Sequence, residues 1–320
     1  MESIIESKPY SNWTELVTDL KKNKNSSRIY RGHSNDYCLP KSIESKIAFL
    51  TGHFSHNIGF KKWSLISSFD RYYDGYFYKF VTFLHQQLED GMFDHRYSSY
   101  KLPGISYLTN SNQLERIYYL QHYGVQTCFM DFSHDPLIAL FFSIANVRST
   151  NVCNMRDNNK FIHPAEVYIS CYELNHDKIS ELFNTPKLNK DFSYKIYGKY
   201  KVKNWNVHFA FDLTPIDKCR TDTLNENLKL QNGCFVLYDN NGSDLPLDKF
   251  IDKLFFYENK DKEVVIKEYR LPYNEIFTRH NFEEFEDVSL VNYLNRKKIS
   301  GKDLFNDIQG LKYDLNFFHD

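Results

Sequence analysis

The stretch that decides the fold is VQTCFMDFSHDPLIALFFSIAN, residues 125–146. Its first part, VQTCFMDFS, is typical of a strand or an extended segment. The second part begins at Pro136, a residue favoured at the first position of a helix, and continues as a nearly unbroken apolar run. Ser133 and Asp135 are both candidates for the N-cap of that helix. The stretch therefore predicts a strand followed by a buried helix, with Asp131 and Ser133 at the junction.

Two elements are predicted before this stretch. SNWTELVTDLKKN, residues 11–23, is an amphipathic pattern with Trp13 on its apolar side and Ser11 as the expected N-cap. RIYRG, residues 28–32, is a short strand pattern that ends at a glycine. A strand that ends in an arginine and a glycine raises the question of what the arginine binds.

Further elements are predicted by the same periodicities. Two helices are expected at 112–124 and 288–298, the second ending near Gly301. Strand patterns occupy AEVYISCYEL, GCFVLYD and EVVIKEYRL, at 165–174, 233–239 and 263–271. The fold class that follows is α+β, with mixed, largely antiparallel sheets and flanking helices.

The predicted division of the chain has an N-terminal helical extension, residues 1–27, and one domain over residues 28–320. Within that domain, residues 174–230 are polar and rich in Lys and Asn. We expect this segment to be a mobile insertion and not a second core.

Composition restricts the function classes. Phe, Tyr and Trp make up 17% of the chain, which most often reflects core packing by large rings. A net charge of -1 gives no bulk attraction to nucleic acid or to an anionic membrane. The six cysteines form no C-x-x-C pair, and no apolar run is long enough to span a membrane. These features predict a cytoplasmic protein with reduced thiols and no membrane association.

Several common chemistries lack their motifs. The chain has no H-E-x-x-H and no clustered metal-ligand spacing, so no metal site is predicted. It also has no Walker A sequence, no G-x-G-x-x-G and no G-x-S-x-G. P-loop, Rossmann and α/β-hydrolase chemistry are therefore disfavoured.

The first candidate binding segment is Tyr30-Arg31-Gly32. Arginine at a strand end offers a planar fork for a diphosphate or a carboxylate, and glycine lets a ligand approach the backbone. A structural reading is also open, in which Arg31 pairs with an Asp across the fold and Gly32 makes a turn.

The second candidate segment combines Gln121-His122-Tyr123-Gly124 with Asp131-Phe132-Ser133. Backbone N–H groups at the start of the Pro136 helix could hold an anion, and Asp131 would face or pair with Arg31. The alternative is that His122 packs at a helix end and Ser133 only caps.

The third candidate is Gln231, which leads into the strand pattern GCFVLYD. A glutamine can orient a sugar hydroxyl by hydrogen bonds but cannot act as a general base. On its own the segment is equally typical of a turn before a strand.

Taken in this order, the segments resemble the FRG domain family, named for its (Phe/Tyr)-Arg-Gly motif. The matching stretches are YRGHSNDYCLPKSI, LQHYGVQTCFMDFSHDPLIALFFSIAN, QNGCF and LPYNEIF with LFNDIQGL, over about residues 28–312. More distantly, the arrangement is similar to ADP-ribosyltransferases of the Arg-Ser-Glu type. That second resemblance implies an ADP-ribosyltransferase-like fold and NAD as a substrate.

The resemblance to the transferases also implies a role for each of several residues. Arg31, with Tyr30 and Gly32, would hold the NAD diphosphate, while Ser133 and His122 would line the nicotinamide end. Gln231 takes the place of the family's Glu, so a carboxylate from Asp131, Glu226 or Glu268 would have to supply the charge.

The function that follows is transfer of ADP-ribose from NAD to a protein or nucleic-acid acceptor, with Arg31, Asp131 and Gln231 as catalytic residues. A role as a toxin or antiviral defence effector, with an inhibitory partner protein, is an inference from the style of the family. Two alternatives stay open: a non-enzymatic nucleotide-binding module, which Gln231 favours, and a nuclease using His122 and Asp131.

Overall fold

The computed structural model describes residues near both ends of the chain and several separate stretches between them. Its described residues are 5–33, 65, 121, 127, 129–145, 156–157, 160–161, 168–181, 187–189, 192–202, 205–215, 224–239, 247–248, 251, 264–305, 310–311 and 313–314. The predicted helix 112–124 lies outside these residues apart from Gln121, which is helical.

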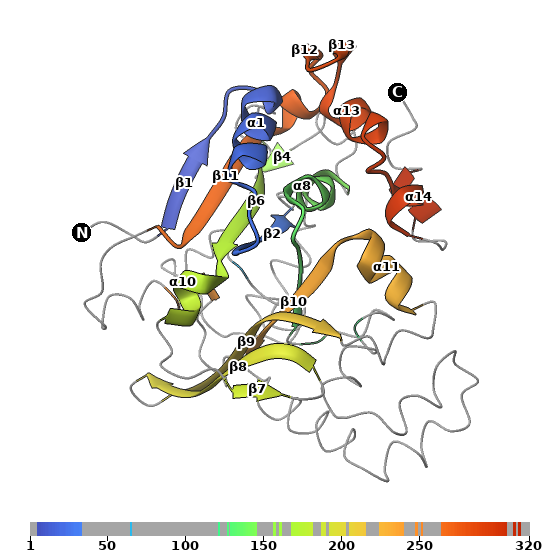
Figure 1. Cartoon of the computed structure of the whole chain (residues 1–320). Helices are drawn as coiled ribbons and strands as arrows, with labels where there is room; N and C mark the ends of the chain where they lie inside the picture. The colour runs from blue at the N-terminus through green and yellow to red at the C-terminus, as the bar shows by residue number, and fades with distance from the viewer. Residues whose placement is uncertain are drawn as a thin grey trace.

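One large sheet organises the described residues (Figure 1). Its strands, in chain order, are β1 (Ile5–Pro9), β2 (Arg28–His33), β3 (Phe129–Ser133), β6 (Tyr168–Asn175), β7 (Lys187–Asn189), β8 (Phe192–Val202), β9 (Trp205–Pro215), β10 (Gly233–Asp239) and β11 (Ile266–Pro272). In space the order is β1-β11-β6-β2-β3-β10-β9-β8-β7. Neighbouring strands are antiparallel except for β1 and β11, which are parallel. The sheet confirms the α+β class with largely antiparallel pairing.

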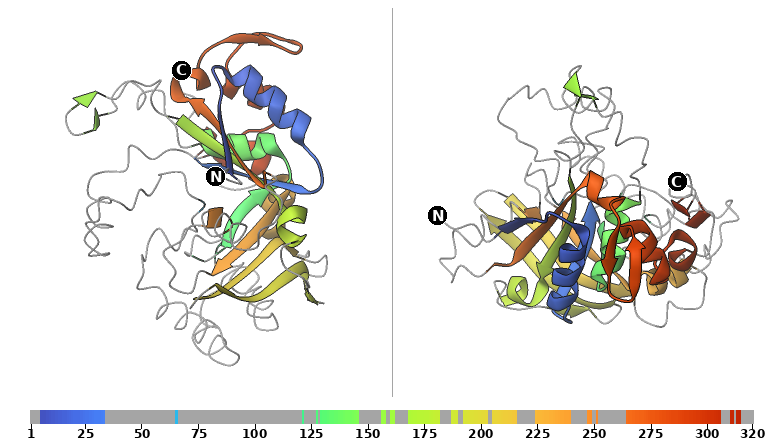
Figure 2. Two further views of the ribbon diagram at one scale, coloured as in Figure 1. Left: turned by 90° about the vertical axis from the view of Figure 1, so that its left-hand side faces the viewer. Right: turned by 90° about the horizontal axis from the view of Figure 1, so that it is seen from above.

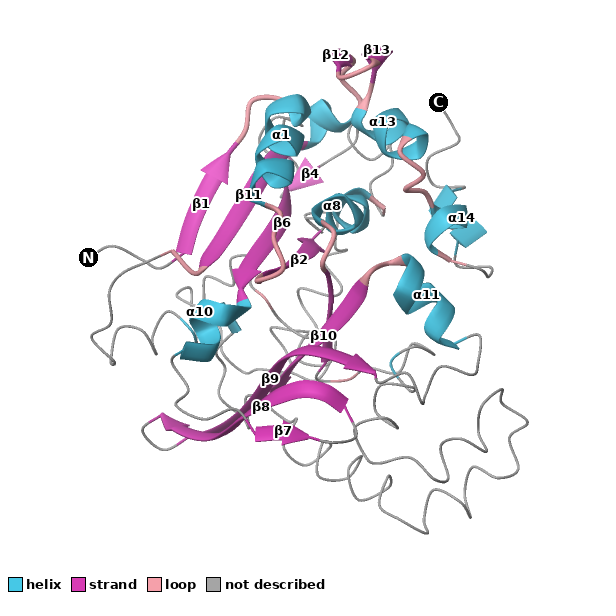
Figure 3. Ribbon diagram, in the orientation of Figure 1, coloured by secondary structure: helices cyan, strands magenta, loops and turns pink. Residues whose placement is uncertain are grey.

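The remaining described elements are helices and two small hairpins (Figure 3). They are α1 (Trp13–Asn23), α8 (Pro136–Ile144), α10 (His176–Glu181), α11 (Leu224–Leu230), the 3-10 helix η3 (Tyr273–Ile276), α13 (Leu290–Arg296) and α14 (Gly301–Leu304), with the hairpin strands β4 (Arg156–Asp157), β5 (Lys160–Phe161), β12 (His280–Phe282) and β13 (Phe285–Val288).

The strand and helix expected in the stretch 125–146 are both confirmed, as β3 and α8. Asp135 is the N-cap, because its side chain accepts a hydrogen bond from the backbone N–H of Leu137. All but one of the nine residues of α8 are buried, so the apolar run packs on every side.

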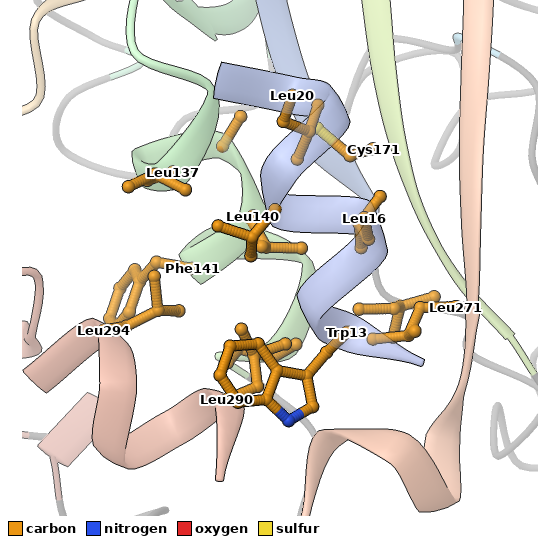
Figure 4. Close-up of a cluster of buried hydrophobic side chains, with 14 of the residues drawn as sticks. Trp13, Leu16, Leu20, Leu137, Leu140, Phe141, Cys171, Leu271, Leu290 and Leu294 are labelled. Carbon is orange, nitrogen blue, oxygen red and sulfur yellow. The ribbon is translucent and has the colours of Figure 1, made fainter. Parts of the chain in front are cut away.

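Helices α1, α8 and α13 pack together over one face of the sheet (Figure 2). Figure 4 shows Trp13 and Leu16 of α1, Leu140 of α8 and Leu290 of α13 in the same cluster of buried side chains. Alternate strand residues, such as Tyr30 of β2, complete this core from the sheet. We call this side of the sheet the helix-covered face.

Two expectations about caps and ends need correction. The N-cap of α1 is Asn12 and not Ser11, because the Asn12 side chain accepts from the N–H of Glu15. The helix predicted over 288–298 is α13, capped by Ser289, and Gly301 begins the separate short helix α14.

The segment 174–230 also differs from the expectation of irregular structure. It contains β7, β8 and β9, which extend the sheet beyond β10. The strand segments FSYKIYGKYKV and WNVHFAFDLTP are rich in Tyr, Phe and Val, which favour strands. Their lysines and asparagines conceal this preference when only overall polarity is considered.

Candidate functional site

The structure places the two candidate residues Arg31 and Ser133 on opposite faces of the sheet. Ser133 of β3 is paired directly with Tyr30 of β2, so the side chains of these two residues share the helix-covered face. Arg31 follows Tyr30 along the strand, and its side chain therefore points to the other face. One small ligand cannot contact both side chains from the same side of the sheet.

Ser133 has a structural role in the turn between β3 and α8. It is buried, and its hydroxyl donates to the backbone carbonyl oxygen of Gln231 at 2.7 Å. The same hydroxyl accepts from the N–H of Asp135 at 3.0 Å. These bonds fix the entry to α8 against the turn that precedes β10.

The N-terminus of α8 is already occupied by a carboxylate of the chain itself. Asp135 caps it, and Lys24 forms an ion pair with Asp135 at 2.7 Å. A bound anion would have to compete with this carboxylate for the same first-turn N–H groups. The predicted anion site at the start of the Pro136 helix is therefore disfavoured.

Gln231 is also held by structural contacts. Its side-chain amide donates to the backbone carbonyl of Leu304 at 3.2 Å, which ties the turn before β10 to α14. The structure does bring Ser133 and Gln231 together, but through the main chain of Gln231 and not through its amide.

Arg31 and Asp131 are close to each other, but not as an ion pair. Arg31 donates to the backbone carbonyl oxygen of Asp131 at 2.6 Å. The Asp131 carboxylate instead accepts from the Gln121 amide at 2.7 Å. His122, the other candidate from this segment, lies outside the described residues.

The two neighbours of Arg31 serve the core. Tyr30 is fully buried, and burial, with Glu173 nearby, raises the pKa of its phenol above the ordinary value. A Cβ atom on Gly32 would lie 1.9 Å from the carbonyl oxygen of Ala139 in α8. Glycine is therefore required here by the close approach of α8, whatever binds at Arg31.

The face of the sheet that points away from α1 and α8 carries a set of polar side chains that no sequence motif predicts. Two rows run across β2, β6 and β11 in direct register. We call the six residues of these rows the far-face cluster; they are Arg31, Tyr172 and Glu268 in one row and His33, Ser170 and Arg270 in the other.

The far-face cluster contains a buried carboxylate on β11. Glu268 is 8% exposed, and its Oε1 atom accepts from the hydroxyl of Ser170 at 3.0 Å and from that of Tyr172 at 3.4 Å. Within the described part of the chain, no lysine or arginine forms an ion pair with Glu268. A buried carboxylate without a cationic partner is costly, and such groups concentrate at functional sites.

Tyr172 acts as a neutral donor to this carboxylate. Burial, together with the charge of Glu268, raises the pKa of Tyr172 well above its ordinary value. The phenol therefore keeps its proton over the physiological range. Ser170 and Tyr172 both bond to Oε1, and no described residue donates a hydrogen bond to the second oxygen of Glu268.

Three basic side chains of the far-face cluster are partly exposed. Arg31, His33 and Arg270 are all half-buried, while the side chains between them are buried. Arg31 lies over the ring of Phe132, with its guanidinium carbon 5.9 Å from the ring centre. Two strand spacings separate Arg31 from Glu268, which corresponds to about 10 Å between their Cα atoms. The arrangement fits a ligand with an anionic group near Arg31 and hydroxyl groups near Glu268.

Ser170 and Glu268 left a weak signal in the sequence. In YISCYEL, Ser170 and Tyr172 are alternate residues of an apolar strand, and Glu268 and Arg270 alternate in the same way in IKEYRL. Such alternation predicts one polar face on each strand. Only the register between strands shows that the two polar faces are the same face.

Comparison with known proteins supports the family assignment. The model described as FRG domain matches residues 26–151, which include Tyr30-Arg31-Gly32 and the β3–α8 unit. Residues 26–151 are therefore similar to the FRG domain. The matched range is shorter than the resemblance predicted, and Ser170 and Glu268 lie beyond it. No curated protein and no solved structure matches the chain.

Two further findings concern the described residues alone. None of their helices is long and apolar enough to cross a membrane. Nor do they contain a group of three or more His, Cys, Asp or Glu side chains placed to hold a metal ion.

Proposed function

We propose that the chain is an NAD-dependent ADP-ribosyltransferase whose reacting site is the far-face cluster. The observation that carries the proposal is the buried Glu268 carboxylate, held by two hydroxyls and placed two strands from Arg31. Arg31, Ser170 and Glu268 also follow one another along the chain in the order of the Arg-Ser-Glu transferases that the sequence resembles. In this proposal Ser170 and Glu268 take the places that the resemblance gives to Ser133 and Gln231.

Four groups of the cluster have roles in this proposal. Arg31 binds the diphosphate of NAD through its guanidinium fork. The free oxygen of Glu268 accepts a hydrogen bond from a hydroxyl of the nicotinamide ribose. Ser170 and Tyr172 hold the other oxygen and so fix the direction of the carboxylate.

The reaction breaks the bond between the ribose C1 atom and the nicotinamide nitrogen. The electron pair of that bond leaves with nicotinamide, and positive charge develops on the ribose. Glu268 stabilises this charge, and a buried site strengthens the interaction because water does not screen it. An acceptor oxygen or nitrogen then forms a bond to C1 and releases its proton.

The test is release of nicotinamide from NAD by the purified full chain, alone and with cell lysate. We expect Glu268→Gln to lower the rate by about 100-fold or more, because transition-state charge stabilisation is usually the largest catalytic effect. Arg31→Ala should raise KM for NAD and also lower kcat.

The matched control is Gln231→Leu, since Gln231 lies in the turn before β10 and contacts Leu304. It should change the rate by less than about threefold in protein that still folds. The proposal fails if no condition gives nicotinamide release, or if Glu268→Gln and Arg31→Ala release it as fast as the unsubstituted chain. NAD binding without turnover, measured by calorimetry, would support a binding module instead.

A further inference from the structure

A stacked arginine and tyrosine lie next to Glu268 in the structure. Arg270 follows Glu268 by two residues on β11, so both side chains lie on the same face. The guanidinium carbon of Arg270 is 4.4 Å from the ring centre of Tyr168, the first residue of β6. Both side chains are half-buried. A planar cation held against an aromatic ring forms a flat surface that is both apolar and positively charged.

The position of this pair relates it to the acceptor. Across the sheet, Arg31 is on β2 and Glu268 is on β11, with β6 between them. Arg270 lies at the Glu268 end of this line, away from Arg31. The inference rests on the proposed function, in which Arg31 holds the diphosphate and Glu268 the reacting ribose. In this arrangement a nucleophile bound by Arg270 and Tyr168 would lie beside the reacting ribose.

We propose that the acceptor is a nucleic acid, and that Arg270 and Tyr168 form the surface that binds it. A nucleobase can stack on the guanidinium and the ring, and a phosphate can accept hydrogen bonds from the guanidinium fork. An arginine or lysine acceptor is disfavoured, because its cation would lie beside that of Arg270. The net charge of -1 restricts the contact to a few nucleotides, since it supports no long phosphate-binding groove.

The chemical step balances with these partners alone. A nucleophilic oxygen or nitrogen of the nucleotide forms a bond to the ribose C1 atom of NAD. The bond from C1 to the nicotinamide nitrogen breaks, nicotinamide leaves with the electron pair, and the proton of the nucleophile passes to water.

The experiment compares acceptors in one reaction. The full chain is incubated with labelled NAD and either a mixed-sequence single-stranded RNA, the DNA of the same sequence, or a nuclease-treated protein extract. Arg270→Ala and Tyr168→Leu test the surface. Arg279→Ala is the matched control, because Arg279 is exposed and paired with Asp287 beside the β12–β13 hairpin.

We expect label on RNA or DNA, and a loss of about tenfold or more in Arg270→Ala and Tyr168→Leu. Release of nicotinamide to water by Tyr168→Leu, whose side chain is not part of the far-face cluster, should stay within about threefold of the unsubstituted chain. Binding of the oligonucleotides without NAD should weaken in the two variants and be unchanged in Arg279→Ala.

Label on protein alone would overturn the inference and leave the proposed function in place. The inference is also overturned if oligonucleotides are labelled equally by Arg270→Ala and by the unsubstituted chain. Failure of the unsubstituted chain to release nicotinamide overturns the proposed function itself. The binding measurements then still report whether Arg270 and Tyr168 contact nucleic acid.

Discussion

Two buried glutamates on neighbouring strands of the sheet differ in their partners. Glu268 on β11 faces away from the helices, and its hydrogen bonds within the described part of the chain come from two hydroxyls. Glu173 on β6 faces α1, accepts from Arg28 at 2.5 Å and accepts from the phenol of Tyr269 at 2.6 Å. Glu173 therefore has the contacts of a structural group, whereas Glu268 is the carboxylate that the proposed function uses.

The pH dependence of stability should report the state of Glu173. Burial raises the pKa of Glu173, against the opposing effects of Tyr269 and Arg28. The folded state therefore binds this proton more tightly than the unfolded state, so that the contribution of Glu173 to stability falls as pH rises. The fall begins near the unfolded pKa, about 4.5, and ends above the folded pKa.

Urea unfolding of the unsubstituted chain and of Glu173→Gln between pH 4 and 8 measures this effect. The free energy of unfolding of the unsubstituted chain, relative to that of Glu173→Gln, should decrease with rising pH. Subtracting the variant removes the contributions of all other titrating groups that do not interact with Glu173. A difference that rises with pH would show that the Arg28 and Tyr269 contacts outweigh burial.

At the scale of single elements, the start of helix α1 allows Asn12, its N-cap, to be compared with the neighbouring Ser11. The Asn12 side chain accepts from the Glu15 N–H at 3.0 Å, whereas the Ser11 hydroxyl contacts only the exposed Glu15 carboxylate at 3.3 Å. Asn12→Ala should lower the free energy of unfolding by about 1 kcal/mol, and Ser11→Ala by less than about 0.5 kcal/mol. Chemical denaturation of both variants checks this, and equal losses would contradict the assigned cap.

How far each element could be predicted depends on whether its signal is local. The β3–α8 unit was predicted closely, because Pro136 and the following apolar run specify a helix start within a few residues. Ser11 and Asn12 are both good caps, so the sequence alone could not choose between them. Strands β8 and β9 were missed because they lie in a segment that is polar overall, and because three lysines interrupt the aromatic residues of β8.

The candidate site needed information that no local pattern contains. Arg31 was identified from its motif, but its partners Ser170 and Glu268 lie more than a hundred residues away along the chain. A shift of one residue in strand register would move either of them to the helix-covered face. The sequence motif instead pointed to Ser133, which the register places on the other side of the sheet.

At the scale of the whole molecule, the first residues of the chain belong to the main fold. Residues 1–27 were expected to form an extension, yet β1 pairs with β11 and α1 packs on α8. Trp13 joins the two ends of the described chain: its indole N–H donates to the carbonyl of Thr278 at 3.0 Å. Its ring also packs against Phe282 and Tyr293, both with centroids 5.3 Å away.

Trp13→Ala, which removes the indole ring, should therefore destabilise the whole molecule. Trp13 is fully buried, and removing a buried ring of this size typically lowers the free energy of unfolding by about 3–5 kcal/mol. Trp13→Phe should cost less, because the smaller ring keeps part of the packing and loses the bond to Thr278.

A chain that begins at Lys24 would lack both β1 and α1. It would leave β11 unpaired on one side and expose the α8 residues that α1 covers, so we expect it to be insoluble or to lack a cooperative unfolding transition. Thermal unfolding followed by circular dichroism measures all three variants. A truncated chain with a transition as sharp and as high as that of the full chain would show that residues 1–23 are an extension after all. Because the far-face cluster is built on β2, β6 and β11, and β1 borders β11, the same truncation should also abolish NAD turnover.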